Sequence, residues 1–260
     1  MGCTARAPLV AVSLLVWLAG CAVIRPMRPT LRTEHLSGGP GASSSRGLLV
    51  MLPGIGDGAR SFERRGFVED AREAGLACDV TLVDAHFTYY LTQDIAVRVE
   101  EDILRDARRR GYRSIWLVGV SLGGYGAMLT ARAHPELVDG VVLVAPLLGV
   151  PPREAAVADE IRAAGGLHAW TGARDLSPPL HHFREPRVIW DWLRAETLDP
   201  ARRGRVVLAY GADDPRADRY ALLARALPDD AVVRVRGRHD WPTWRSLWRR
   251  VLATPPWAPS

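Results

Sequence analysis

The sequence predicts an α/β protein with a mostly parallel, doubly wound sheet. One observation indicates this class, and the length of the chain allows a core of sufficient size. Short apolar runs alternate with segments of helical periodicity along the chain, and this alternation is typical of a parallel sheet covered by helices on both faces. With 260 residues, the chain can also bury about 70% or more of its unfolded surface in a core.

The predicted strands are short apolar runs and the predicted helices lie between them. The strands cover residues 47–52, 79–84, 114–119, 140–145, 205–210 and 231–235. The helices cover residues 61–74, 92–110, 122–133, 216–226 and 243–252. In the second helix, the apolar residues Ile95, Val99, Ile103 and Ala107 recur at every fourth position, which indicates a single buried stripe.

One interval, residues 150–204, is too long for a simple crossover between neighbouring strands. It contains helical patterns at 152–164 and 186–195, so we expect an inserted helical segment before the penultimate strand. Its large aromatic residues either line an apolar pocket or pack the insertion onto the body, and the sequence leaves both open. These residues are Trp170, Phe183, Trp190 and Trp192.

The motif Gly119-Val120-Ser121-Leu122-Gly123 follows directly on the predicted strand 114–119. A strand that turns through G-x-S-x-G into a helix is a nucleophile elbow. The turn is too sharp for side chains beside the serine, which explains the glycines. We therefore expect Ser121 in a strained backbone conformation, with its hydroxyl exposed at the start of the next helix.

Two later turns supply the partners that a serine nucleophile needs. The strand 205–210 runs into a turn with Asp213 and Asp214, and the strand 231–235 runs into a turn with His239. A histidine can take the proton of the serine as it attacks, and a carboxylate can fix and stabilise the imidazole. Serine, acid and histidine thus follow one another in this order along the chain, each at the end of a predicted strand.

These motifs resemble the α/β-hydrolase superfamily, in particular its esterase- and lipase-like serine hydrolases, over about residues 46–253. The resemblance implies an α/β-hydrolase fold with a cap or lid at 150–204 and a triad of Ser121, Asp214 and His239. The family commonly places its acid three residues after the glycine that ends the penultimate strand, which favours Asp214, with Asp213 as the runner-up.

The run Pro53-Gly54-Ile55-Gly56-Asp57 follows the predicted strand 47–52. It resembles the H-G-x-G oxyanion loop of the same superfamily, with Pro53 where many members have histidine. The resemblance implies that the backbone N–H groups of Ile55 and Leu122 form the oxyanion hole.

The predicted activity is cleavage of an ester or thioester through an acyl-enzyme, on a small-molecule or lipid-like acyl substrate. We expect no cofactor, because this chemistry needs none. We also expect no metal site: the adjacent His181 and His182 point apart and lack ligand spacing. The alternatives are an acyltransferase with the same triad and a non-catalytic binding lipoprotein on the same scaffold.

The N-terminus has one positive charge, Arg6, an apolar stretch over residues 8–18, and then Leu18-Ala19-Gly20-Cys21. The stretch is far shorter than the ~20 residues of a membrane-spanning helix, and it has the form of a secretory signal. The last four residues resemble a bacterial lipobox. This implies a signal peptide over residues 1–20, a lipid on Cys21, and a membrane partner through that lipid. The alternative is an ordinary cleaved signal.

The lipobox resemblance implies localisation in the bacterial cell envelope, outside the cytoplasm. Ala22 in place of aspartate favours the outer membrane, on its periplasmic side. Residues 21–46 are rich in Pro, Gly and Ser and are predicted as a flexible tether. The hydrolase domain then covers residues 47–253, and residues 254–260 form a short C-terminal tail.

The formal net charge of +5 could suit a nucleic acid, but no recognised nucleic-acid motif accompanies the arginines. We therefore expect a solvated basic face and no nucleic-acid partner. Cys78 is predicted to be a small buried hydrophobe. Trp241, Trp244 and Trp248 follow helical spacing and predict the buried face of the last helix.

Overall fold

The computed structural model describes residues 25–38, 47–150, 152–172 and 186–257. The predicted signal peptide, Cys21, Phe183 and the pair His181-His182 lie outside these ranges.

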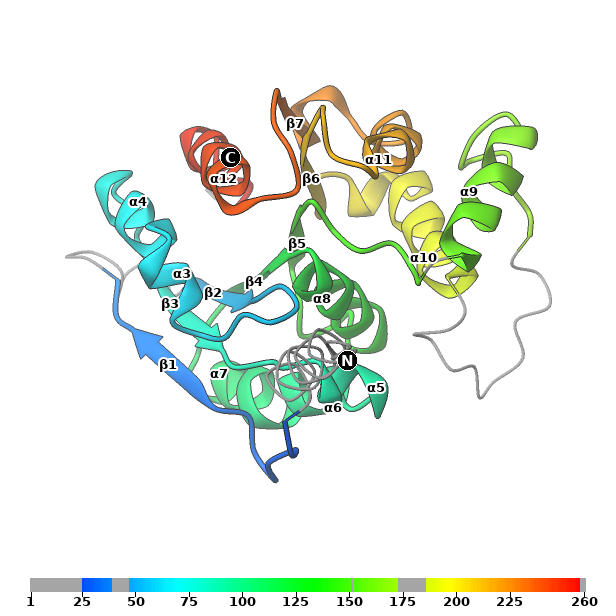
Figure 1. Ribbon diagram of the computed structural model, residues 1–260. Coiled ribbons are helices and arrows are strands. Elements are labelled where there is room, and N and C mark those ends of the chain that lie inside the picture. The colour runs from blue at the N-terminus through cyan, green and yellow to red at the C-terminus, as the bar shows by residue number, and fades with distance from the viewer. Residues whose placement is uncertain (1–24, 39–46, 151, 173–185, 258–260) are drawn as a thin grey trace, which may run out of the picture.

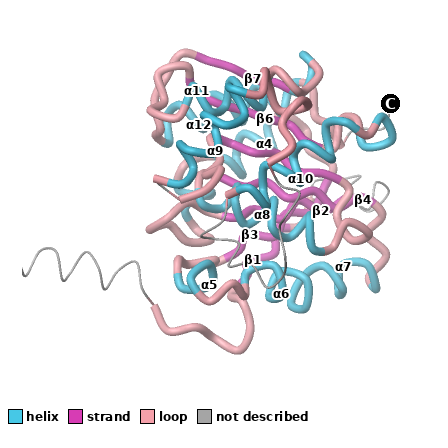
Figure 2. The backbone as a smooth tube through the Cα atoms, turned by 90° about the vertical axis from the view of Figure 1, so that its right-hand side faces the viewer, coloured by secondary structure: helices cyan, strands magenta, loops and turns pink. Residues whose placement is uncertain are grey.

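Seven strands form one sheet in the order β1-β3-β2-β4-β5-β6-β7. Only β1 runs antiparallel to its neighbour, and all other pairs are parallel. Figure 2 shows the strands side by side across the molecule, with β1 near one end and β7 at the other. The strands are β1 (Thr33–Leu36), β2 (Gly47–Leu52), β3 (Cys78–Val83), β4 (Ser114–Val120), β5 (Gly140–Val144), β6 (Val206–Gly211) and β7 (Val232–Val235). The predicted fold class is confirmed.

Helices cover both faces of the sheet (Figure 1), which explains why β2 and β5 are buried along their whole length. The helices α3, α4 and α12 lie on one face, and α5 to α8 and α11 lie on the other (Figure 1). The regular helices are α3 (Ser61–Arg64), α4 (Phe67–Glu73), α5 (Thr88–Leu91), α6 (Ile95–Val99), α7 (Arg105–Arg109), α8 (Leu122–Ala133), α9 (Arg153–Ala163), α10 (Arg187–Leu198), α11 (Ala217–Ala224) and α12 (Trp241–Ala253). Two short 3₁₀ turns, Pro200–Arg202 and Asp229–Ala231, precede β6 and β7.

The strand order reverses its direction at β2, because β3 lies on one side of it and β4 on the other. In open α/β sheets such a switch point opens a crevice at the carboxyl ends of the strands, and ligands bind there. The end of β4 carries Ser121, so the topology places the predicted nucleophile at this point.

The first strand corrects part of the predicted tether. Residues 33–36 pair with β3, Leu31 is buried, and its amide donates to Asp102 Oδ2 at 2.8 Å. The side chain of Arg25 donates two hydrogen bonds to Asp84, at 2.9 and 3.2 Å. Residues 25–38 therefore belong to the folded body, because backbone pairing and buried contacts hold them there.

Two of the predicted helices are divided in the structure. The helix 61–74 is broken at Gly66, whose φ of 78° is left-handed, and a Cβ there would lie 2.2 Å from the Arg245 side chain. The helix 92–110 contains a π-helical turn at Glu100–Leu104. A strict four-residue spacing drifts by about 40° per step on an α-helix, and the wider π turn keeps this stripe, including Val99 and Ile103, on the buried face.

The interval between β5 and β6 contains α9 and α10, as the sequence predicts. Its described tryptophans are buried within the main core, which favours the packing role over a pocket lining. They are Trp170, Trp190 and Trp192. In α12, Trp244 and Trp248 are buried and Trp241 is half-buried.

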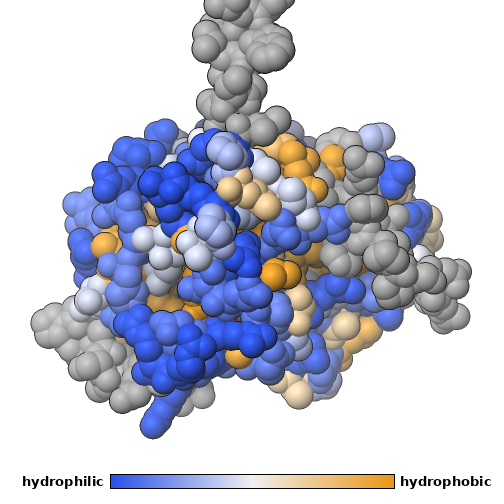
Figure 3. Space-filling view, turned by 90° about the horizontal axis from the view of Figure 1, so that it is seen from below, coloured by the Kyte–Doolittle hydropathy of each residue, from blue (hydrophilic) through white to orange (hydrophobic). Residues whose placement is uncertain are grey.

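Hydrophilic residues predominate on the face that bears β1 and α5 to α7 (Figure 3). The arginines predicted to form a basic face are mostly paired: Arg105 contacts Glu100, Arg108 contacts Asp139, and Arg109 contacts Asp106. Within the described ranges, no helix combines the length and the apolar character needed to cross a membrane.

Candidate active site

Ser121 occupies the turn between β4 and α8 with a backbone φ of 51° and ψ of −113°. Positive φ is rare for a residue with a side chain, and such strain costs about 1–3 kcal/mol. Neighbouring backbone groups hold the turn: the Ser121 amide donates to Val144 O at 3.0 Å, and Leu147 N donates to Ser121 O at 2.9 Å. The strain predicted for this serine is therefore present.

The glycines of the motif are explained by close backbone contacts. A Cβ on Gly119 would lie 2.4 Å from Gly123 O, and a Cβ on Gly123 would lie 2.0 Å from Leu52 O. Neither position can hold a side chain without moving backbone. The glycines thus let α8 begin directly against β4 and the end of β2.

The structure brings the three predicted triad side chains into one hydrogen-bonded series. Ser121 Oγ lies 3.0 Å from His239 Nε2, and His239 Nδ1 lies 2.6 Å from Asp214 Oδ2. A carboxylate can only accept, so Nδ1 carries the proton and donates to Asp214. In the neutral imidazole, Nε2 is then the acceptor for the serine hydroxyl.

The two aspartates differ sharply in their surroundings. The Asp214 side chain is fully buried, and its second oxygen accepts the Arg216 N–H at 2.9 Å. The Asp213 side chain is 51% exposed and lies 3.8 Å from Arg236. Of the pair that the sequence left open, only Asp214 contacts His239.

The turns that carry the acid and the histidine are bonded to each other. Asp213 N donates to Gly237 O at 2.9 Å, and Ala212 N donates to Val235 O at 2.8 Å. Asp240, directly after His239, caps α12 by accepting the Thr243 N–H at 3.0 Å. A hydrogen bond from the Thr243 side chain contributes most to a lowered pKa of the Asp240 carboxyl, and the bond from the Thr243 backbone N–H lowers it further.

The predicted oxyanion loop lies beside the serine. A Cβ on Gly54 would be 3.6 Å from Ser121 Cβ, so the loop passes directly by the nucleophile. Leu122 is the first residue of α8 and Ile55 is the next residue after Gly54. Within the described ranges, neither the Ile55 nor the Leu122 amide has a backbone acceptor, and a free N–H at each position is what an oxyanion hole requires.

Sequence reasoning missed three contacts of the site. Trp244 packs edge-on against the His239 ring with centroids 5.0 Å apart. The Arg216 amide holds Asp214, and Asp240 begins α12. The spacing from Asp240 to Thr243 is a recognisable capping signal, and an aspartate that binds the amide two residues later is a common Asx turn.

Within the described ranges, no group of three or more His, Cys, Asp or Glu residues is arranged to hold a metal ion. Burial raises the pKa of the Cys78 thiol to about 11. This thiol is thus held protonated, in keeping with the predicted structural role.

Residues 47–188 match the sequence model of a protein family described as the alpha/beta hydrolase fold. The chain belongs to this family. A search of curated proteins found no match.

Solved structures resemble the chain at low sequence identity. A monoacylglycerol lipase of Paleococcus ferrophilus is 19% identical with a TM-score of 0.53, over 89% of this chain and 99% of that one. Serine hydrolase F of Staphylococcus aureus, described as fluorophosphonate-binding, is 15% identical with a TM-score of 0.52, over 88% and 95%. At such identity these likenesses establish the fold, and function has to be argued from the site.

Proposed function

We propose that this protein is a serine hydrolase that cleaves an ester or thioester of a small-molecule or lipid-like acyl substrate. The observation that carries the proposal is the continuous series Ser121–His239–Asp214, with distances of 3.0 and 2.6 Å, on a strained elbow. Hydrogen-bond distances of this kind are what proton transfer between a nucleophile and its base requires.

In the first half of the reaction, Ser121 Oγ attacks the carbonyl carbon and its proton passes to His239 Nε2. The imidazolium that forms is stabilised by the Asp214 carboxylate on Nδ1. Collapse of the tetrahedral intermediate breaks the bond to the leaving alcohol or thiol, which receives the proton from Nε2. The acyl group remains on the serine.

In the second half, water attacks the acyl-enzyme while His239 takes its proton. The serine then leaves as the new carboxylic acid is released, and it regains a proton from the imidazolium. In both halves the carbonyl oxygen becomes an oxyanion, and the N–H groups of Ile55 and Leu122 are proposed to bind it. Loss of one such donor typically costs about 10²–10³ in rate.

The nucleophile is tested with Ser121→Ala and an exposed control on α12, Ser246→Ala. We expect the wild type and the control to turn over p-nitrophenyl acetate and to react with a fluorophosphonate probe, whereas Ser121→Ala does neither. All three proteins should share one far-UV spectrum and one melting temperature within a few degrees. Wild-type turnover by Ser121→Ala would refute the mechanism.

We also propose that Cys21 carries a lipid and that the protein is anchored in the bacterial cell envelope, with the outer membrane favoured. The support is the sequence Leu18-Ala19-Gly20-Cys21 behind a short apolar stretch. Cys21→Ser should abolish lipid labelling and leave the precursor unprocessed, while the matched control Cys78→Ser should not. A soluble wild-type species without added acyl mass would contradict the proposal.

A further inference from the structure

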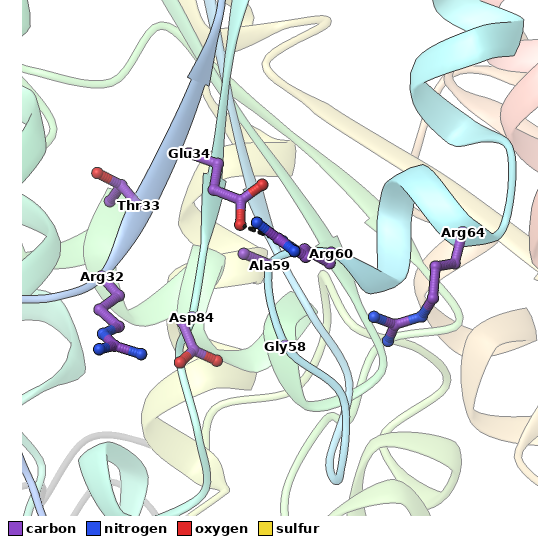
Figure 4. Close-up of a pocket in the computed structure, with 8 residues that line it drawn as sticks. All are labelled: Arg32, Thr33, Glu34, Gly58, Ala59, Arg60, Arg64 and Asp84. Atoms are coloured by element: carbon purple, nitrogen blue, oxygen red, sulfur yellow. Dashed lines mark hydrogen bonds and ion pairs between the residues drawn. The ribbon is translucent and has the colours of Figure 1, made fainter.

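A polar pocket of about 480 Å³ lies at the carboxyl edge of the sheet, beside β1 and the loop that follows β2. Its lining residues come from three segments that are distant in sequence: Arg32, Thr33, Glu34, Gly58, Ala59, Arg60, Arg64 and Asp84. Figure 4 shows Arg32 and Arg64 on opposite sides of the loop that carries Gly58. Neither Ser121 nor His239 lines it.

Both carboxylates of the pocket are already neutralised. Arg60 donates to Glu34 at 2.8 Å, as the dashed line in Figure 4 marks. Asp84 accepts two hydrogen bonds from Arg25, at 2.9 and 3.2 Å. The pocket therefore has no carboxylate left to repel an anion.

Two guanidinium groups of the pocket keep their charge uncompensated. Among the described residues, neither Arg32 nor Arg64 forms an ion pair, and Arg64 donates only to the Ser61 hydroxyl, at 3.0 Å. Arginine presents a planar fork of donors that fits the oxygens of phosphate or carboxylate. The chemistry of the pocket thus selects an oxyanion group.

The loop that follows β2 connects the pocket to the nucleophile elbow. Gly54 contacts the nucleophile elbow and Gly58 lines the pocket. A turn closes between them, because Asp57 N donates to Gly54 O at 3.2 Å. Residues that bracket such a turn are less than about 7 Å apart, so Gly58 lies within about 11 Å of Gly54.

We propose that this pocket binds an anionic group, a phosphate or a carboxylate, on the ester that Ser121 attacks. The inference rests on the proposed function, since it names the class of substrate for that site. An anionic group carried by the ester would lie against Arg32 or Arg64, which line the pocket from opposite sides of the loop with Gly58, while the carbonyl lies at the serine. Binding energy from this remote group then positions the reacting carbonyl.

The test uses two substrates that differ only in the phosphate, 1-decanoylglycerol and 1-decanoylglycerol 3-phosphate, with decanoate release as the readout. We expect the wild type to favour the phosphate ester by about tenfold in kcat/KM, the effect of two exposed charge contacts. The double variant Arg32→Ala/Arg64→Ala should lose this preference and keep its rate on decanoylglycerol. The matched control is Arg113→Ala. Arg113 is exposed and lies directly before β4, at the amino ends of the parallel strands, and this variant should behave as wild type.

The outcomes separate this inference from the proposed function. Turnover of both esters and of p-nitrophenyl acetate without a preference, or with a preference that survives in the double variant, would overturn the inference alone. No turnover of any of the three esters would overturn the proposed function and the inference with it. Calorimetric binding of inorganic phosphate that needs Arg32 and Arg64, together with no ester preference, would assign the pocket to free phosphate and also overturn the inference.

Discussion

Replacing Asp214 and Asp213 one at a time by asparagine tests the reasoning about the acid most directly. Asp214→Asn keeps the shape of the side chain but removes the charge that lies 2.6 Å from His239 Nδ1. An amide cannot stabilise the imidazolium and can favour the wrong tautomer, a change that costs about 10⁴ in kcat in a serine triad. This corresponds to about 5.4 kcal/mol of transition-state stabilisation.

Asp213→Asn removes a carboxylate that is half exposed and 3.8 Å from Arg236. Pairs of this kind contribute about 0–1 kcal/mol, so the expected loss is no more than about fivefold. The assay is kcat/KM for p-nitrophenyl acetate, with the melting temperature of each variant as the control for folding. A larger loss at Asp213, or equal small losses, would show that the buried contact to His239 does not identify the acid.

Three further substitutions and labels probe other features of the fold. Gly123→Ala should destabilise the protein by about 3 kcal/mol or more in urea unfolding, because its Cβ would meet Leu52 O at 2.0 Å; a loss below about 1 kcal/mol would contradict the close packing of the elbow. Burial raises the pKa of Glu154, so its ionised form is disfavoured in the folded state. The free energy of unfolding of the wild type, relative to Glu154→Gln, should therefore stay constant in acid and fall as pH rises through that raised pKa. A pH-independent difference between the two proteins would refute this. Cys78, with its pKa raised to about 11, should react with iodoacetamide at pH 8 about a hundredfold more slowly in the native protein than in urea; equal rates would show that the thiol is accessible.

Most of the strands that the sequence predicted have side chains buried on both faces, whereas β7 is half-buried and was predicted from its valine-rich run. The run over β2 is buried at every position, and such runs can be recognised without knowing the partner strands. The strand β1 gives no such signal, because residues 33–36 alternate between exposed and half-buried and include Glu34 and His35. Its place is fixed by backbone pairing with β3, which the sequence pattern does not express.

Part of the candidate site could also be predicted from the sequence pattern, and part could not. Ser121 and His239 were predictable because each follows an apolar strand run at the carboxyl edge of the sheet, where side chains converge. The choice of Asp214 over Asp213 depends on which carboxylate the turn after β6 directs inward, and adjacent residues have the same local composition. The π turn at Glu100–Leu104 was not predicted, although the strict four-residue spacing of the apolar stripe is the pattern that such a wider turn keeps on one face.

The contact between Arg25 and Asp84 has a consequence for how the protein would meet a membrane. Asp84 follows β3 at the same edge of the sheet as Ser121, so the N-terminal segment leaves the body at the active-site edge. If Cys21 carries lipid as proposed, four residue steps separate it from Arg25, which span at most about 14 Å. The lipid would hold that edge against the bilayer surface, and the search for substrate would become two-dimensional, among molecules that lie in the same leaflet.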